Sequence, residues 1–209
     1  MISAREALKR LQDGNRRFVS DEVHRDRLRG EARRKELVTG QAPFAIILGC
    51  SDSRVPAEIV FDQGLGDLFV IRVAGNIVEP SQIGSVEFAA TQFGTRLVVV
   101  LGHSQCGAVL ATLEQLRRPT ENHSRNLLSI VDRIRPAVES LIVDGTMPND
   151  GDLVAAAVRA NVRFSVRHLR HGSTILEHLI AGDGLIVVGA EYSLETGEVI
   201  FFDTGDAVD

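Results

Sequence analysis

The sequence predicts an α/β domain with a mostly parallel sheet, and three features of the chain indicate this fold class. Continuous apolar runs such as 44–49 and 97–101 are typical of strands buried on both faces. Helical stretches separate these runs, as in domains built from alternating strands and helices. The turn 195–197 is short and contains a glycine, so the last two strands should pair as a hairpin. We therefore expect a mostly parallel central sheet flanked by helices, with an antiparallel edge strand and an N-terminal helical arm.

Each element follows from a local pattern. Residues 4–19 form an amphipathic helix with Ser3 as its N-cap, and a very basic helix covers 25–38 and stops at Thr39 and Gly40. Strands are expected at 44–49, 67–73, 97–101, 184–189 and 199–202. Helices are expected at 55–61, 82–93, 106–116, 124–142, 152–170 and 173–181. We divide the chain into a helical arm, 1–40, and an α/β domain, 41–209, that carries the candidate functional residues.

The composition is that of a soluble globular protein, since 44% of the 209 residues are hydrophobic and 24% are charged. No apolar run approaches the roughly 20 residues that span a bilayer, and the first residues show no signal peptide. We therefore expect a cytoplasmic location and no membrane partner. In such a chain two cysteines favour free thiols, a metal site or chemistry over a disulfide.

The charge is distributed unevenly. Residues 1–40 hold eleven of the 23 Lys and Arg against seven Asp and Glu, whereas the remainder holds twelve against 21. Nucleic-acid binding would require aromatic residues among those basic ones, and Phe18 is the single aromatic residue of the segment. We expect no nucleic-acid partner, and we expect solvated helix faces or an arm lying on an acidic partner surface.

The two cysteines each follow a predicted strand. Cys50 comes directly after 44–49, and Cys106 lies three residues after His103, which follows 97–101. If these strands are neighbours, their carboxyl ends lie about 5 Å apart and the three side chains can meet. Two thiolates and one imidazole with an open fourth position are typical of a catalytic zinc. We expect one Zn²⁺ per subunit, with Cys106 in the first turn of the next helix.

Asp52 and Arg54 accompany the first cysteine. Residues two apart in an extended segment project to the same side, so Cys50, Asp52 and Arg54 can share one face. Asp52 would then lie beside the open metal position, and Arg54 would pair with it and keep it ionised. We expect these two residues to be catalytic, with a carboxylate that orients the nucleophile and could also swing onto the metal.

Other interpretations of these residues remain open. The cysteines could be buried core thiols or a redox pair, and a structural zinc could take Asp52 as its fourth ligand. The turn 72–76 could cradle an anion or simply end a strand. The remaining histidines lack a second ligand at useful spacing and are expected at the surface or at helix ends: His24, His123, His168, His171 and His178.

Five segments resemble those of the β-class carbonic anhydrases. They are Gln41-Ala42-Pro43, the run from Gly49 to Glu58, the run from Leu68 to Asn76, the run from Gly84 to Ala89, and the run from Gly102 to Ala108. The combination of Cys-x-Asp-x-Arg with His-x-x-Cys about fifty residues later carries most of the resemblance. The rest of the chain fits this family in length and order.

The resemblance implies zinc on Cys50, His103 and Cys106, an Asp52–Arg54 pair that manages the fourth position, and reversible hydration of CO2 to bicarbonate and a proton. It also implies a homodimer or homotetramer whose N-terminal helices embrace the neighbouring subunit, which would place the basic arm on an acidic partner. In the family, residues at the places of Gln41, Phe69 and Phe88 line a substrate cleft at the subunit interface. We assign Gly107 to the same cleft.

Two departures and two rival functions accompany this resemblance. Phe88 stands where a Tyr is common, and Ile47 stands where family members with an inhibitory bicarbonate site carry Trp, so we expect a member without that site. The rival enzyme is a hydrolase of CS2 or carbonyl sulfide that uses the same zinc ligands. The rival without catalysis is a zinc-holding protein that binds a partner.

Overall fold

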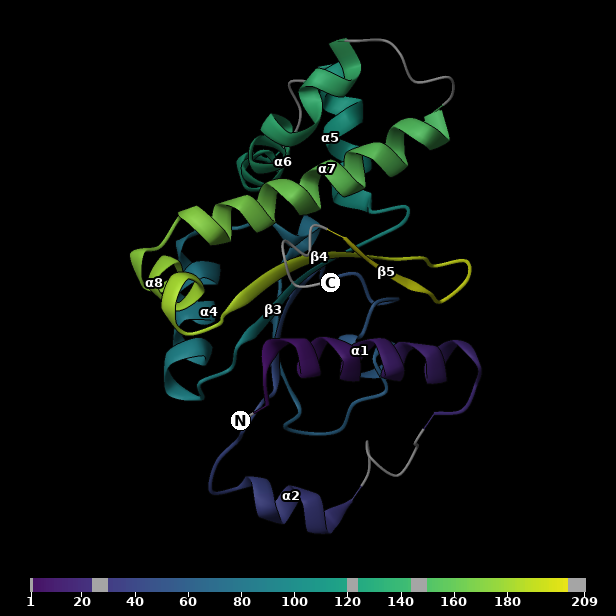
Figure 1. The fold of residues 1–209 in the computed structure, drawn as a ribbon. Coiled ribbons are helices and arrows are strands. Elements are labelled where there is room, and N and C mark those ends of the chain that lie inside the picture. Colours follow the sequence, from purple (N-terminus) through teal and green to yellow (C-terminus); the bar gives the residue numbers. More distant parts are fainter. Residues whose placement is uncertain (1, 24–29, 120–123, 144–149, 203–209) are drawn as a thin grey trace.

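The computed structural model describes residues 2–23, 30–119, 124–143 and 150–202, and within them five strands form one sheet (Figure 1). The order is β2-β1-β3-β4-β5, with the first four strands parallel and β5 antiparallel to β4. The strands are β1 (Ala45–Gly49), β2 (Leu68–Arg72), β3 (Leu97–His103), β4 (Ile186–Tyr192) and β5 (Val199–Phe202). The predicted fold class and the terminal hairpin are confirmed.

The helices also agree with the predicted ones, with ends that differ by a few residues. They are α1 (Ala4–Val19), α2 (Glu31–Leu37), α3 (Ala57–Val60), α4 (Pro80–Gln92), α5 (Gly107–Arg117), α6 (Arg125–Val143), α7 (Asp150–His171) and α8 (Thr174–Gly182). A short 3-10 turn, η2 (Ala74–Asn76), follows β2. Residues 24–29 lie outside the described residues, so the predicted basic helix 25–38 is tested only over its second half.

The fourth strand was placed too early in the sequence. Gly184 has φ +69 and belongs to the turn, so β4 begins at Ile186. It then continues to Tyr192 because it pairs with β3 along its whole length, from Leu97 to His103. This pairing carries β3 two residues beyond its predicted end and makes His103 its last residue.

Alternating side chains of the strands pack on two opposite helical layers (Figure 1). Ile47 and Val99 face a cluster completed by α1 and α3, whereas Ile46 and Val98 face one completed by α4, α7 and α8. A third apolar cluster lies among α5, α6 and α7 and includes both cysteines. Within the described residues, no helix is long and apolar enough to cross a bilayer.

Helix α1 packs on its own chain. Leu8 and Leu11 are buried in the cluster with the β1 and β3 side chains, and the ring centroids of Phe18 and Tyr192 are 6.4 Å apart. One face of the chain's own sheet therefore covers these apolar side chains. The division of the chain at residue 40 stays a prediction.

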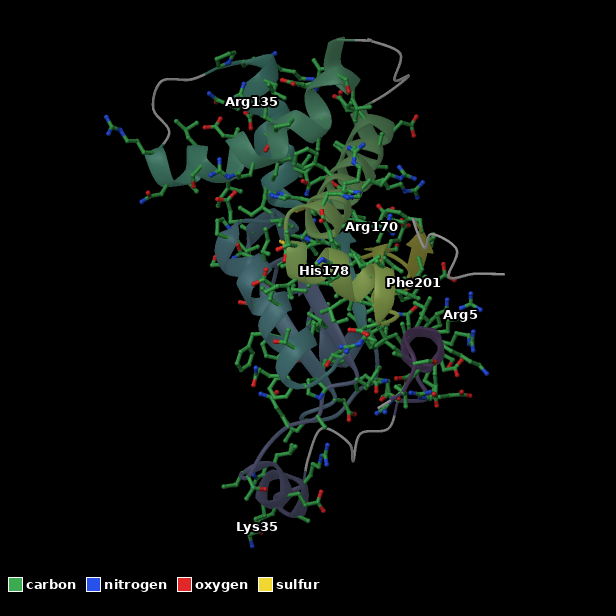
Figure 2. The ribbon with its side chains drawn as sticks, turned by 60° about the vertical axis from the view of Figure 1, so that its left-hand side comes forward. Arg5, Lys35, Arg135, Arg170, His178 and Phe201 are labelled. Carbon is green, nitrogen blue, oxygen red and sulfur yellow. The ribbon has the colours of Figure 1, made fainter. Side chains whose placement is uncertain are left out.

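Three arginines of the first 40 residues have acidic partners on the body of the same chain. Arg10 and Arg33 both lie near the carboxylate of Asp67, at 3.1 and 3.9 Å, and Arg17 pairs with the buried Asp62 at 2.5 Å. Figure 2 shows α2, which carries Lys35, set apart from the body of the molecule. The uneven charge of the sequence is thus partly matched by ion pairs within one chain.

We expect Leu11→Ala to lower the free energy of unfolding by about 2–5 kcal/mol, because it removes a fully buried side chain and leaves a cavity between α1 and the sheet. Urea denaturation followed by circular dichroism measures this change. Lys9→Ala, on the exposed face of the same helix, is the control and should stay within about 0.5 kcal/mol of the parent. Equal midpoints for the two variants would contradict the packing of α1 on its own sheet.

Candidate metal centre

Cys50, His103 and Cys106 meet at the carboxyl ends of two adjacent strands. Strand β1 pairs with β3 in parallel, with Gly49 opposite Leu101, so the residues that follow them converge. One potential ligand atom from each residue lies within 4.8 Å of the others, and all three side chains are buried. The predicted adjacency of the two strands and the predicted grouping of the three side chains are both confirmed.

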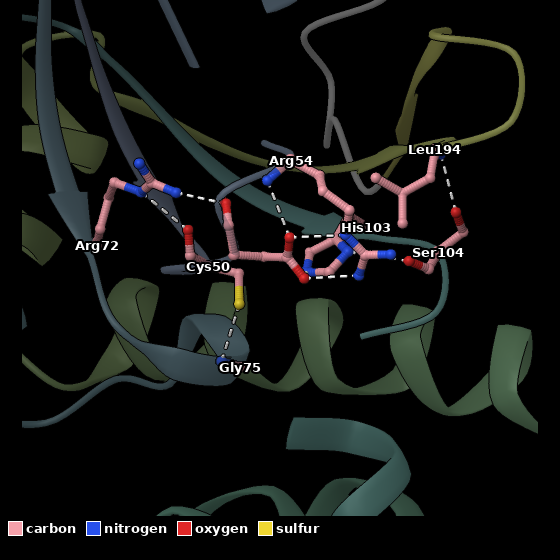
Figure 3. A network of polar contacts seen from close by, with 8 residues as sticks. Cys50, Arg54, Arg72, Gly75, His103, Ser104 and Leu194 are labelled. Atoms are coloured by element: carbon pink, nitrogen blue, oxygen red, sulfur yellow. Dashed lines mark hydrogen bonds and ion pairs between the residues drawn. The ribbon is translucent and has the colours of Figure 1, made fainter. Parts of the chain in front are cut away.

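The orientation of His103 suits metal binding. Its Nδ1 lies 2.9 Å from the carbonyl oxygen of Ser104. The N–H of Ser104 donates to the carbonyl of Tyr192 at 2.9 Å. The hydroxyl of Ser104 accepts the N–H of Leu194, also at 2.9 Å (Figure 3). The other ring nitrogen, Nε2, is buried and has no hydrogen-bond partner among the described residues. A buried nitrogen without a partner is costly unless something binds it, and a metal ion would do so.

The two thiols behave as one unit. The Cys106 thiol lowers the pKa of Cys50 by hydrogen bonding, with further help from His103 and the backbone of Gly75 against the opposing effect of burial. The same hydrogen bond raises the pKa of Cys106, and burial and the charge of Cys50 act in the same direction. Burial lowers the pKa of His103, but the proximity and charge of Cys50 outweigh it and the net shift is upward. A divalent cation would replace these protons and satisfy all three groups.

The predicted pairing of Asp52 with Arg54 is present. Arg54 donates through Nε and Nη2 to the two carboxylate oxygens, at 2.9 and 2.7 Å, and through its backbone N–H at 3.0 Å (Figure 3). The side-chain bonds from Arg54 hold the pKa of Asp52 well below its usual range. Asp52 Oδ2 also lies 3.8 Å from His103 Nε2, which places the carboxylate beside the cluster.

The backbone around this pair differs from the expected extended segment. Asp52 accepts the N–H of Arg54 on its side chain and that of Val55 on its carbonyl, and these bonds close a turn. The prediction that an extended backbone brings Cys50, Asp52 and Arg54 onto one face is therefore wrong. The side chains approach because the turn folds Arg54 back onto Asp52.

Arg72 belongs to the site, although the sequence did not predict a role for it. It is the last residue of β2, opposite Gly49 of β1. Its Nε donates to the carbonyl of Cys50 at 3.0 Å, and its Nη2 donates to that of Asp52 at 2.6 Å (Figure 3). Its guanidinium fixes the backbone that carries both Cys50 and Asp52. The sequence feature that could have indicated this role is an arginine at the end of a predicted strand.

The turn after β2 belongs to the same centre. Gly75 has φ +70, and its N–H donates to the Cys50 sulfur at 3.3 Å. Residues 72–76 therefore end the strand in a turn, which is one of the two interpretations given for them, and the N–H of Gly75 in this turn faces the Cys50 thiol.

Cys106 occupies the N-cap of α5, one position before the helical turn in which it was predicted. The preceding Gln105 has φ +55, so the chain reverses sharply between His103 and the helix. The positive end of the helix favours a thiolate at this position. Gly107 follows at the surface, and a Cβ there would meet nothing within 4 Å.

The predicted cleft residues are not gathered at the metal ligands within one chain. Phe69 and Phe88 lie together, with centroids 6.2 Å apart, and Phe93 completes the cluster edge to face with Phe88 at 5.5 Å. Phe69 packs against the cluster of α4, α7 and α8 side chains rather than the one holding the cysteines, and half of Phe88 is exposed. Gln41 is exposed in a surface hollow beside α2.

The remaining histidines agree with the expected surface role where they are described. His168, His171 and His178 are exposed on α7 and α8. His24 and His123 lie outside the described residues.

Comparison with known proteins agrees with this centre. A family model described as carbonic anhydrase matches residues 45–199. The chain is 38% identical to "Carbonic anhydrase 2" of Mycobacterium tuberculosis over 94% of this chain and 92% of the relative. It is 40% identical to a carbonic anhydrase of Mycolicibacterium smegmatis, over 92% and 90% of the two chains.

Solved structures give the same result. The β-carbonic anhydrase CcaA aligns with a TM-score of 0.73 and 28% identity, covering 94% of this chain and 87% of that one. A structure from a report on two tetrameric β-carbonic anhydrases of Sordaria macrospora aligns over 91% and 94% of the chains with a TM-score of 0.75 and 22% identity, which supports the fold. The chain belongs to the β-class carbonic anhydrase family.

Proposed function

We propose that this protein hydrates CO2 reversibly to bicarbonate and a proton, with one zinc ion per subunit held by Cys50, His103 and Cys106. The observation that carries the proposal is the buried nitrogen of His103, which has no partner among the described residues and lies with two thiols in one cluster. Such a donor set suits a catalytic zinc, because three protein ligands leave a fourth position for chemistry.

The chain's own residues define the reaction geometry. Zinc on these ligands would act as a Lewis acid that lowers the pKa of a water molecule. Asp52, kept ionised by Arg54, can accept a hydrogen bond beside His103 and so orient the nucleophile. Arg72 fixes the backbone of Cys50 and Asp52, and therefore the separation between the first ligand and the orienting carboxylate.

A stopped-flow assay of CO2 hydration over a range of pH, with zinc content measured on the same sample, tests this function. We expect hydration that scales with zinc content. The same preparation should be compared on carbonyl sulfide and CS2. Turnover of the sulfur compounds with none of CO2 would overturn the proposal in favour of the hydrolase.

The zinc-holding partner-binding protein is disfavoured by the Asp52–Arg54 pair. A purely structural site needs four protein ligands, and Arg54 holds both oxygens of Asp52, the nearest candidate for a fourth.

We also propose a cytoplasmic location, which the two buried free thiols support because a reducing compartment keeps such groups reduced.

We propose that the chain assembles as a homodimer or homotetramer through the aromatic cluster of Phe69, Phe88 and Phe93. These three rings contact one another, and half of the Phe88 side chain is exposed to solvent. Exposed aromatic clusters of this kind are typical of protein interfaces. This assembly would bring Gln41, Phe69 and Phe88 to a cleft at the subunit interface, in agreement with their predicted role.

We expect Phe88→Asp to dissociate the oligomer, because it places a charge in the middle of that aromatic surface. Sedimentation velocity should show a smaller species than the parent protein forms. Leu127→Asp, which changes another exposed apolar residue on α6, is the matched control and should keep the parent's assembly. A Phe88→Asp protein with the parent's sedimentation coefficient would remove this surface from the interface.

A further inference from the structure

Helix α7 buries two polar side chains in an otherwise apolar face. Asn161 and Ser165 are each 1% exposed, and their neighbours Val162 and Val166 are fully buried in the core. The two polar residues are one helical turn apart and so lie on the same side of α7. Burying an amide and a hydroxyl is costly unless each is hydrogen-bonded, so their partners indicate their role.

Both side chains bind the turn that follows β2. Asn161 Nδ2 donates to the carbonyl of Gly75 at 2.8 Å, and Ser165 Oγ donates to that of Asn76 at 3.0 Å. These two consecutive residues have φ values of +70 and +44, a left-handed conformation that glycine adopts freely and asparagine adopts more readily than most residues with a side chain. Helix α7 therefore fixes two successive peptide groups in this conformation.

Packing restricts the turn from another side. A Cβ on Gly75 would lie 2.7 Å from the Cδ1 of Ile134, on α6, and 3.1 Å from the Cβ of Ala108, on α5. The turn is thus enclosed by α5 and α6 while α7 holds its carbonyls. The group that this arrangement directs is the N–H of Gly75, which faces the Cys50 sulfur at 3.3 Å.

We propose that Asn161 and Ser165 are positioning residues that keep the Gly75 N–H on the Cys50 thiolate and so determine how firmly the site retains its metal. An N–H donated to a thiolate stabilises its negative charge and fixes the direction of its lone pairs. The two residues act through the Gly75–Asn76 turn, about 86 residues distant in the chain from Asn161. This inference rests on the proposed zinc site.

The test compares metal retention in Asn161→Ala, Ser165→Ala and the parent protein. Zinc loss to an excess of a chromophoric chelator should be about 10–100-fold faster in Asn161→Ala, the usual effect of removing a partner behind a metal ligand. Ser165→Ala, which removes a single oxygen, should show a smaller increase in the same direction. In cobalt-substituted proteins the thiolate-to-metal charge-transfer band should shift in both variants, since the sulfur loses a well-aligned donor.

Asn15→Ala is the matched control, because Asn15 is also a buried amide that holds distant backbone groups. It donates to the carbonyls of Val60 and Gly197 and accepts the N–H of Val199, away from the metal ligands. It should lower the melting temperature and leave both the zinc-loss rate and the cobalt band unchanged. Parent-like zinc loss and an unshifted band in both α7 variants would overturn the inference, whereas a parent protein that binds no zinc would instead overturn the proposed function.

Discussion

Cys106→Ser is expected to release zinc and to abolish CO2 hydration. The buried cluster supplies three ligands, and the fourth position is needed for chemistry, so no protein group is in reserve. A serine hydroxyl stays protonated at neutral pH and is a poor substitute for a thiolate. We expect zinc below one per subunit by atomic absorption and hydration at the uncatalysed background. Cys50→Ser and His103→Ala should behave alike.

Thr112→Val is a suitable control for this loss. Thr112 is fully buried on α5, six residues after Cys106, and its hydroxyl donates to the carbonyl of Ala108 within the same helix. Its replacement preserves shape and should retain both zinc and activity. Full zinc occupancy in Cys106→Ser would remove that residue from the ligand set.

Arg54→Ala is expected to retain zinc but to lower hydration by about 10²–10⁴-fold, the usual contribution of a positioned acid–base group. The variant removes the two side-chain hydrogen bonds to Asp52, keeps the one from the backbone N–H and removes no candidate ligand. The freed carboxylate can rotate towards the metal position, because Oδ2 already lies 3.8 Å from His103 Nε2. Stopped-flow rates and zinc analysis on the same samples measure the two effects.

The pH dependence should change in a defined direction. Arg54 holds the pKa of Asp52 well below its usual range, so in the parent protein this carboxylate stays ionised as the pH falls. Its contribution to stability is present above its ordinary pKa and is lost as the pH falls through the lower, folded value. In Arg54→Ala that pKa returns towards its ordinary value, so ionised Asp52 should be lost at a higher pH.

Asp52→Ala separates the two effects of the arginine. It should also keep zinc, but it has no carboxylate that can close onto the metal. X-ray absorption at mildly acidic pH, above the ordinary pKa of an aspartate, should detect a carboxylate oxygen on zinc in Arg54→Ala and water alone in Asp52→Ala. Arg135→Ala removes an exposed ion pair on α6 and is the control for losing a surface guanidinium. Near-normal activity of Arg54→Ala at every pH would show that this pair does not control the site.

Local pattern predicted much of the fold, because apolar runs and glycine turns act over a few residues. The strand 44–49 and the helix 4–19 appear almost where they were expected, and the hairpin of β4 and β5 follows from its short loop. The boundaries of β4 were wrong because its length depends on pairing with β3, which is a contact between segments about ninety residues apart.

The position of α1 shows the limit of amphipathic pattern. The apolar side chains of α1 must be buried, but periodicity does not show whether they pack on the chain's own sheet or on that of a partner. The open face of β1 and β3 supplies that cover in the structure, and Leu11 is fully buried there. The proximity of this face in the folded chain decided the outcome.

By itself, the sequence predicted the three candidate metal ligands, which the structure brings together, and the pairing of Asp52 with Arg54, because residue chemistry and spacing indicate both. The tertiary structure alone revealed that Arg72 holds the carbonyls of Cys50 and Asp52, and that Asn161 holds the turn whose amide faces the Cys50 sulfur. These are hydrogen bonds to backbone groups, which every residue carries. A side chain that bonds a distant carbonyl therefore leaves no periodic pattern in the sequence. The pairing of β2 with β1 selects the partners of Arg72, and the packing of α7 selects that of Asn161.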